Sequence, residues 1–418
     1  MQNSQTPLLE IPSDGEIKLL NTERLMSLLP ATTTCTFYKG FAPILQIEAR
    51  VKAILDLNPW LAGRLRRNPQ KEMVLSVPMT YNLSKHFFVV KSSTISSKFF
   101  NSETKSNNTY GMLVKELVKL ERVVVKDGNQ CVDKDEPLFR ISIINNFERN
   151  EFAIVFSLSH LIADGYTFYM LYRMLDSSYM PLQMKAERQK AFEKENQELI
   201  NNHISPIQIM AAAIGLFFQL IRCMLEWLLY RIILRRESVC LYMIDNDWVQ
   251  REKKIHSTED TWVSTNDVIT SWLFKTLDCS LGSMVVNLRD RIPSVGQEHA
   301  GNYMSTIFYQ APDYATPKLI RDSITGDTFG RTVTGPTTIW TFLRFKNAHI
   351  TSWTGFYHEL KFDNCNQIVH IPIIQESLRV IGFVGILFVP NDGKLALLSS
   401  HESLKNNEGN LLPFEFDG

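Results

Sequence analysis

The chain has 418 residues and a mass of 48.1 kDa, which is long for a single hydrophobic core and favours two domains. Lys plus Arg number 44 and Asp plus Glu number 44, so the formal net charge is +0, with 44% hydrophobic and 21% charged residues. This composition excludes a disordered charged tail, a collagen-like chain and a small disulfide scaffold. The neutral charge gives no reason to expect a nucleic-acid partner.

Six cysteines are scattered along the chain, without CxxC spacing and without a histidine at zinc-ligand spacing. We therefore expect buried, reduced thiols and no bound metal. Residues 1–17 are polar and contain no apolar stretch of the kind found in a secretory signal. Together these features predict a cytoplasmic protein.

The first elements have helical patterns. Residues 44–65 contain an amphipathic stretch that predicts a helix ending near Asn58-Pro59. Its apolar residues at helical spacing are Leu45, Ala49, Val51, Ile54 and Leu55. Residues 110–120 predict a second helix.

A strand pattern follows. Two apolar, β-rich runs, residues 138–145 and 152–159, flank a polar run and predict a β-hairpin. Residues 166–175 have a helical pattern, and the highly charged residues 184–202 are typical of a solvated helix or a linker.

Residues 206–234 form an unusually apolar segment with a narrow polar stripe. Gln219, Arg222 and Glu226 interrupt it, so it does not read as a clean transmembrane span. Two interpretations stay open: a helix buried between domains, or a helix lying in a membrane interface with basic residues at the headgroups.

The second half again mixes both patterns. Residues 265–277 predict a helix, and residues 378–389 and 394–400 flank an Asn-Asp-Gly sequence that is a strong hairpin signal. Strand patterns occur at residues 284–288 and 339–345. Strands and helices in both halves predict an α/β protein. The predicted division is an N-terminal domain at 1–185, a helical linker at 186–245 and a C-terminal domain at 246–418.

The best candidate for chemistry is the run SHLIADG, from Ser159 to Gly165. His160 follows an apolar strand, where an imidazole titrates near neutral pH and can take a proton from an alcohol, amine or thiol. Asp164 can orient the histidine, or cap the next helix and pair with an arginine. Gly165 permits a backbone geometry that other residues resist. The alternative is a structural histidine at a strand end beside an ordinary helix cap.

No nucleophile motif accompanies His160: GxSxG, HExxH, Walker A and GxGxxG sequences are all absent. If His160 is catalytic, the pattern therefore favours direct general-base attack over a covalent intermediate.

The HLIADG run resembles the HxxxDG motif of the acyl-CoA-dependent acyltransferase superfamily, which includes chloramphenicol acetyltransferase, the plant BAHD enzymes and peptide-synthetase condensation domains. Further segments resemble BAHD-type segments in the expected chain order. They are NPWLAGRL at 58–65, STNDV at 264–268 with Trp272, NLRDRIP at 287–293 with Gly301-Asn302, and TSW at 351–353 with Glu359. The resemblance covers about residues 40–400.

This resemblance implies a fold and a reaction. The fold would be two similar α/β domains of the chloramphenicol acetyltransferase type, with a tunnel that acyl-CoA enters from one face and the acceptor from the other. His160 would deprotonate the hydroxyl or amine that attacks the thioester, and would then return the proton to the CoA sulfur. Acyl-CoA would be a co-substrate, and no bound cofactor is implied.

The resemblance also assigns Asp164 a structural role, pointing away from the substrate toward an arginine. Arg289 of the NLRDRIP segment is the candidate partner. A buried carboxylate without a cation is costly, so loss of either residue is expected to disorder the loop of His160.

Other residues match positions near the reacting atoms. Thr351 and Trp353 match donors to the developing oxyanion, which suits a hydroxyl and an indole N–H. For Trp353, core packing is an equal alternative. Ser264 and Thr265 match a CoA-side segment, or they cap the next helix.

Two departures from the pattern narrow the assignment. Where BAHD-type proteins carry DFGWG, residues 361–365 read KFDNC, so only Phe362 is retained. Ser159 replaces the second histidine that condensation domains and wax-ester synthases usually carry, which disfavours both.

The sequence thus predicts a monomeric acyltransferase that moves an acyl group from acyl-CoA to a hydroxyl or amine, with ester formation preferred. A non-catalytic protein of the same fold with a binding or regulatory role is the alternative, kept open by the altered DFGWG segment. Intact His160, Asp164 and Gly165 weigh against it. Residues 206–234 raise the expectation of a lipid-like acceptor and a peripheral membrane location.

Overall fold

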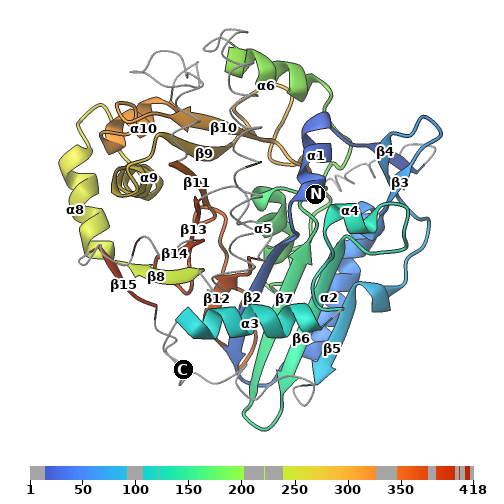
Figure 1. Ribbon diagram of the computed structural model, residues 1–418. Helices are drawn as coiled ribbons and strands as arrows, with labels where there is room; N and C mark the ends of the chain where they lie inside the picture. The colour runs from blue at the N-terminus through green and yellow to red at the C-terminus, as the bar shows by residue number, and fades with distance from the viewer. Residues whose placement is uncertain are drawn as a thin grey trace, which may run out of the picture.

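The computed structural model describes residues 15–91, 107–120, 122–201, 221, 239–325, 346–374, 383–400, 404 and 410–414 (Figure 1). The strand expected at 339–345 lies outside these residues, and so does the apolar segment 206–234 apart from Ile221. The helices are α1 (Asn21–Leu25), α2 (Ile44–Leu57), α3 (Asn107–Lys119), α4 (Gly128–Cys131), α5 (Gly165–Arg173), α6 (Ala191–Asn201), α8 (Asn246–His256), α9 (Thr265–Thr276) and α10 (Pro317–Asp322).

A five-stranded mixed sheet carries most of the N-terminal half, with strand order β12-β2-β7-β6-β5. Its strands are β12 (Asn366–Pro372), β2 (Thr32–Lys39), β7 (Glu151–Leu158), β6 (Phe139–Asn146) and β5 (Phe87–Lys91). The predicted hairpin is confirmed, because β6 and β7 pair antiparallel. Strand β5 pairs parallel with β6, and the remaining pairs are antiparallel.

A seven-stranded mixed sheet carries the C-terminal half, with strand order β10-β9-β11-β13-β14-β8-β15. Its strands are β10 (Met304–Tyr309), β9 (Leu281–Asn287), β11 (Asn347–Ser352), β13 (Phe383–Phe388), β14 (Ala396–Ser399), β8 (Cys240–Ile244) and β15 (Leu411–Pro413). Strand β11 runs parallel to both β9 and β13. The hairpin expected around residues 391–393 is confirmed as β13 and β14. A small third sheet consists of β1 (Glu16–Lys18), β4 (Met73–Ser76) and β3 (Arg64–Arg67).

Two strands pair across the domain boundaries that the sequence predicted. Strand β12, from the C-terminal half, pairs with β2, so that His370 lies opposite Thr36. Strand β8, inside the predicted linker 186–245, pairs with β14 and β15 of the seven-stranded sheet. These pairings join residues that are far apart in sequence, and local hydrophobic patterns do not encode such partners.

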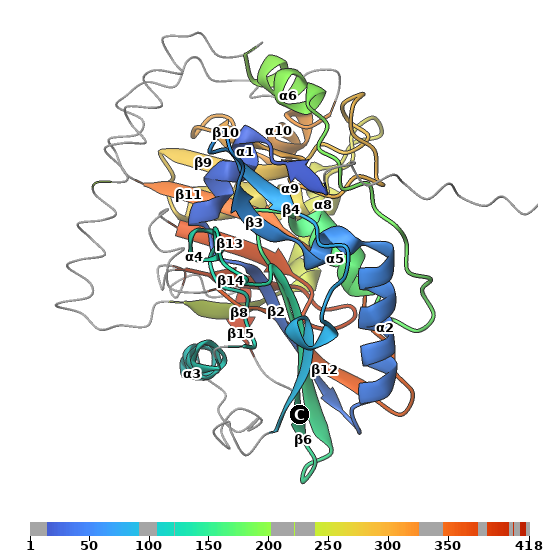
Figure 2. The same cartoon turned by 90° about the vertical axis from the view of Figure 1, so that its right-hand side faces the viewer.

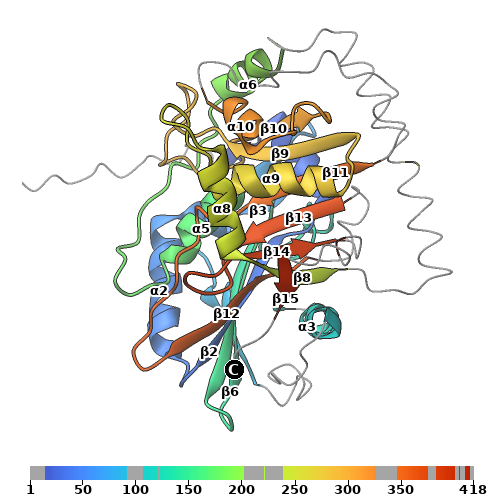
Figure 3. The same cartoon turned by 90° about the vertical axis from the view of Figure 1, so that its left-hand side faces the viewer.

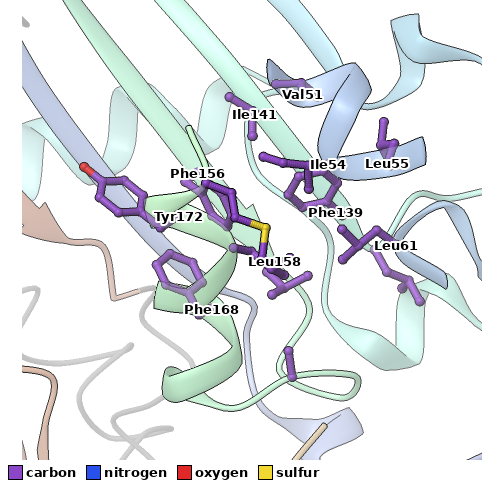
Figure 4. Close-up of a cluster of buried hydrophobic side chains, with 14 of the residues drawn as sticks. Val51, Ile54, Leu55, Leu61, Phe139, Ile141, Phe156, Leu158, Phe168 and Tyr172 are labelled. Carbon is purple, nitrogen blue, oxygen red and sulfur yellow. The ribbon is translucent and has the colours of Figure 1, made fainter. Parts of the chain in front are cut away.

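Helix α5 packs on the five-stranded sheet and brings aromatic side chains into its core. Phe168 of α5 lies 4.8 Å from Phe156 of β7 between ring centroids, and Tyr172 lies 5.7 Å from the same ring. Figure 4 shows these rings together with side chains of α2. The predicted helix α2 is confirmed, but its expected face is wrong at Leu45, which is 80% exposed, and at Ala49, which is also exposed. Ile47, four residues before Val51, takes its place in the core.

Helix α9 packs on the seven-stranded sheet, on the face away from α5 (Figures 1 and 3). Figure 2 shows α5 from the other side of the molecule. The cysteines among the described residues form no disulfide, and all except Cys365 are buried. Within these residues, no helix has both the length and the apolar character needed to cross a bilayer.

Candidate active site

His160 lies in the turn between β7 and α5, as the sequence predicted. The turn is held by backbone hydrogen bonds, in which Ser159 N donates to Leu138 O at 2.8 Å and Ile162 N donates to Ser159 O at 3.1 Å. Both chain neighbours of His160 are buried, whereas its own side chain is half-buried. The fold therefore presents the imidazole from a rigid strand end.

Burial of His160 favours the neutral imidazole. Burial lowers the pKa of His160, while contacts with its own backbone, the negative charge of Asp164 and the side chain of Asn302 oppose the shift. Its Nδ1 atom is buried and has no well-aligned hydrogen-bond partner in the described part of the chain. A neutral imidazole carries one unprotonated ring nitrogen, which is able to accept a proton at neutral pH.

Asp164 caps helix α5 and forms an ion pair with Arg289, as expected from the sequence. Its Oδ1 accepts from Thr167 N at 2.9 Å, which satisfies a donor of the first helical turn. Its Oδ2 accepts from Arg289 Nη1 at 2.7 Å and from Tyr303 N at 3.0 Å. Both charged side chains are buried and have lost their hydration, so each is stabilised by the opposite charge of the other.

Arg289 joins the loop after β9 to the loop of His160. Its guanidinium also donates to His299 O at 3.0 Å and to Gly301 O at 3.1 Å, and lies 4.3 Å above the ring of Tyr166. Gly301 in turn accepts from Asp164 N at 3.2 Å. The two segments that carry the HxxxDG and NLRDRIP resemblance are therefore one connected unit.

A second buried ion pair, which the sequence did not predict, also contacts the backbone of the His160 turn. Arg188 Nε donates to Glu23 Oε2 at 2.9 Å, and both side chains are almost completely buried. Arg188 Nη2 donates to Ile162 O at 2.9 Å. Asn302 donates to His160 O at 2.9 Å and, through its backbone N, to Glu23 Oε1 at 3.1 Å. Of Glu23, Arg188 and Asn302, only Asn302 lies in a segment that resembles the BAHD-type pattern, the Gly301-Asn302 pair.

Gly165 does not have the special backbone geometry that the sequence analysis expected. It is the first residue of α5, and its φ lies outside the left-handed region. A Cβ atom at this position would lie 3.6 Å from Nε1 and Cδ1 of Trp353. The absence of a side chain at Gly165 therefore leaves space beside the indole N–H of Trp353. Gly165 contributes this space and not an unusual backbone conformation.

Thr351 and Trp353 come from β11 and the residue that follows it. Trp353 N donates to Leu387 O at 2.8 Å, and the half-buried indole packs against Phe168 and Tyr169 of α5. The indole therefore combines core packing on one side with a position beside Gly165 on the other. Thr351 is half-buried, and its hydroxyl makes no hydrogen bond to any described residue.

Ser264 and Thr265 lie at the start of α9. Ser264 is the N-cap: its hydroxyl accepts from Asp267 N at 3.3 Å, and Asp267 Oδ2 accepts from Ser264 N at 2.6 Å. This reciprocal pair is a capping box. The cap that the sequence analysis offered as the alternative to CoA binding is therefore present.

The KFDNC segment that stands in place of DFGWG has a packing role. Phe362 is buried, and its ring lies 5.5 Å from that of Tyr38 on β2. Cys365 N donates to Phe362 O at 3.1 Å, which closes a turn. The turn packs against Gly40, where a Cβ atom would lie 2.6 Å from Asn364 O. In the described residues, no group of three or more His, Cys, Asp or Glu side chains could hold a metal ion.

Comparison of the sequence with known protein families and with curated proteins finds no match. The structure, in contrast, is similar to solved structures over nearly its whole length. TRI101 of F. graminearum, complexed with ethyl coenzyme A, matches with a TM-score of 0.60 at 11% identity, covering 94% of this chain and 97% of that chain.

Two other solved structures match in the same way. Vinorine synthase matches with a TM-score of 0.55 at 14% identity, covering 94% of this chain and 91% of its own. The first condensation domain of the calcium-dependent antibiotic synthetase matches with a TM-score of 0.57 at 10% identity, covering 92% and 90%. This chain therefore has the two-domain, mixed α/β fold of the chloramphenicol acetyltransferase type.

Proposed function

We propose that the protein is an acyl-CoA-dependent acyltransferase that acylates a hydroxyl or amine, with ester formation preferred. The observation that carries the proposal is His160, which is half-buried at a strand end, has a lowered pKa and is held in place through the Asp164–Arg289 pair. The fold supports it, since TRI101 with this fold is complexed with coenzyme A and T-2 mycotoxin. A neutral, positioned imidazole is the group that such a transfer requires.

In the proposed reaction, neutral His160 takes the proton of the acceptor O–H as the oxygen attacks the thioester carbonyl carbon. A C–O bond forms, and the carbonyl electron pair moves to the oxygen. When that pair returns, the C–S bond breaks, and His160 gives its proton to the departing CoA sulfur. The products are the ester and free CoA, and His160 is neutral again.

The groups around His160 would act on the charge that develops. Trp353 Nε1 and the Thr351 hydroxyl are the proposed donors to the oxyanion. Asp164 would keep its place in the ion pair and orient the turn without touching substrate. Ser264 and Thr265, at the N-terminus of a 12-residue helix, are the proposed contacts for CoA.

The experiment is a thiol-release assay of the full chain with acetyl-CoA and longer acyl-CoA donors against a panel of alcohols and amines. His160→Ala should abolish CoA release while its circular dichroism spectrum and thermal midpoint stay near those of the wild type. CoA release that survives in this variant would remove His160 as the base. Saturable binding of acyl-CoA without turnover would instead favour the non-catalytic alternative.

We also propose, from the sequence pattern alone, that residues 206–234 place the protein at the surface of an intracellular membrane. Flotation with liposomes tests this. Replacing Phe217 and Phe218 by serine should release the protein from the liposomes. Equal flotation of the variant and the wild type would contradict interfacial binding by this segment.

A further inference from the structure

Strand β11 has one face toward α9 and the opposite face toward α5 and the turn of His160. Ala348 and Ile350 are buried in the core that α9 covers. The residues between them, His349 and Thr351, point to the other face because side chains alternate along a strand. In Figure 1, β11 lies between α9 and α5, and Figure 3 shows α9 in front of the sheet.

His349 is a fixed group on this second face. It lies opposite Ser283 in the parallel pairing of β11 with β9. Its Nδ1 atom is 2.9 Å from Ser283 Oγ, which also donates to Ala348 O at 3.2 Å. The hydrogen bond fixes the orientation of the ring. The other ring nitrogen, Nε2, makes no hydrogen bond to any residue in the described part of the chain.

His349 and His160 lie close enough to interact electrostatically. Burial lowers the pKa of His349 to about 4, and the positive charge of a protonated His160 contributes to the lowering. His349 therefore stays neutral when His160 has accepted a proton, and it does not compete for that proton. A neutral imidazole with one nitrogen held and one free is a hydrogen-bonding group of fixed direction.

We infer that His349 is a specificity-determining residue, whose Nε2 hydrogen-bonds a second polar group of the acceptor. The inference rests on the proposed transferase function. Thr351 and Trp353 are the proposed donors to the acyl carbonyl, and we assign the group that His349 meets to the acceptor; the amides of the acyl-CoA pantetheine arm are the other source, which the test distinguishes. His349 precedes Thr351 by two residues on the same face, about 7 Å along the strand. The fitting acceptor class is therefore a diol or amino alcohol, extending past Thr351 on the side away from Trp353.

The test uses pairs of acceptors: medium-chain diols or amino alcohols, and for each the mono-alcohol that lacks the second polar group, with one acyl-CoA donor. His349→Phe should raise KM for the bifunctional acceptor about three- to tenfold, the loss of one neutral hydrogen bond. It should change kcat/KM for the mono-alcohol less than twofold. His349→Gln can place its amide oxygen, an acceptor like Nε2, near the same position and should recover part of the loss. Ser283→Ala, which frees the ring, should fall between His349→Phe and the wild type.

Val285 is the matched control, because it is a half-buried apolar residue two positions after Ser283 on the same face of β9. Val285→Ala should affect both acceptors of a pair equally. If His349→Phe also affects both equally, or changes KM for the acyl-CoA instead, the inference is wrong while the proposed function stands. A fall of kcat on both acceptors to the level of His160→Ala would place His349 in proton transfer and likewise overturn it. No turnover of any pair by the wild type would remove the proposed function, and this inference with it.

Discussion

Arg289 Nη1 lies 2.7 Å from Asp164 Oδ2, although the two residues are 125 positions apart in the chain. Arg289 comes from the loop after β9 of the seven-stranded sheet, and Asp164 caps α5 on the five-stranded sheet. The pair therefore links the two halves of the molecule next to His160. Because neither side chain reaches water, each residue depends on the other for its solvation.

Asp164→Asn should lower both stability and activity. It leaves the Arg289 charge buried without a counter-charge, and breaking such a pair costs about 3–5 kcal/mol. Urea unfolding measures the loss. In the double variant with Arg289→Met the free energy of unfolding should fall by less than the sum of the single changes, because no unpaired charge remains. Strict additivity, or an unchanged midpoint for Asp164→Asn, would contradict a structural pair.

Glu23→Gln should lower kcat, because Glu23 and Arg188 hold the backbone of the His160 turn from behind. A shift of about 1 Å in a reacting group can cost on the order of 100-fold in rate. Arg50→Met is the control: Arg50 donates to Met174 O at 3.0 Å, at the far end of α5. It should lower the thermal midpoint but leave kcat unchanged at a temperature where both variants are folded. Equal kcat for both variants would make the Glu23 pair merely structural.

Alanine at two glycines should have opposite consequences. Gly301 has φ +140°, and an added Cβ would lie 3.1 Å from Tyr303 and 3.2 Å from Arg188, so Gly301→Ala should destabilise the protein strongly. Gly165→Ala should leave stability unchanged or slightly raised, because its Cβ meets Trp353 at an ordinary 3.6 Å in a helical turn. It should still reduce kcat by filling the space beside the indole N–H. Thermal unfolding and the thiol-release assay separate the two effects.

The pH dependence of the reaction should follow His160. The base must be neutral, so kcat/KM should rise with pH through the pKa of His160 and stay level above it. Burial lowers that pKa from its ordinary value of 6.5, so the half-maximal rate should lie below pH 6.5. A pH profile of kcat/KM, measured with the acceptor below its KM and the acyl-CoA saturating, checks this. A midpoint above pH 7 would contradict a buried neutral base.

Acid should destabilise the fold through buried histidines other than His160. Burial lowers the pKa of His86 to about 4 and that of His370 to about 3. As the pH falls below 6.5, the unfolded chain binds protons that the folded chain excludes, so the free energy of unfolding decreases until the folded-state pKa is passed. Each group should contribute about 1.4 kcal/mol per pH unit between roughly pH 6 and 4.5.

Urea titrations at several pH values measure this slope. His370 lies between Thr36 Oγ1 at 2.8 Å and Tyr169 OH at 2.9 Å, so His370→Asn retains polarity at the position while removing the titrating group. The slope should fall by the contribution of one proton in this variant. A slope identical to that of the wild type would show that His370 does not stay neutral in the folded protein.

Helix α5, the β6–β7 hairpin and the β13–β14 hairpin were predictable from sequence because each depends on periodicity and turn chemistry within a few residues. The position of His160 between a strand and a helix followed from the same local patterns. The Asp164–Arg289 pairing was also anticipated, but from the resemblance to a known family and not from local pattern. The exposed Leu45 and the ordinary backbone of Gly165 show where even local patterns gave the wrong residue or the wrong reason.

Long-range pairing decided the rest. Strand β12 joins β2, and Glu23 and Arg188, which are 165 positions apart, close on the His160 turn. His349 faces the same site because β11 lies between β9 and β13 with its Ala348 face under α9. Buried charges and polar groups need partners, but the chain can supply those partners from any distance. Periodicity reports which face of an element is buried, and only the packed sheets determine what that face meets.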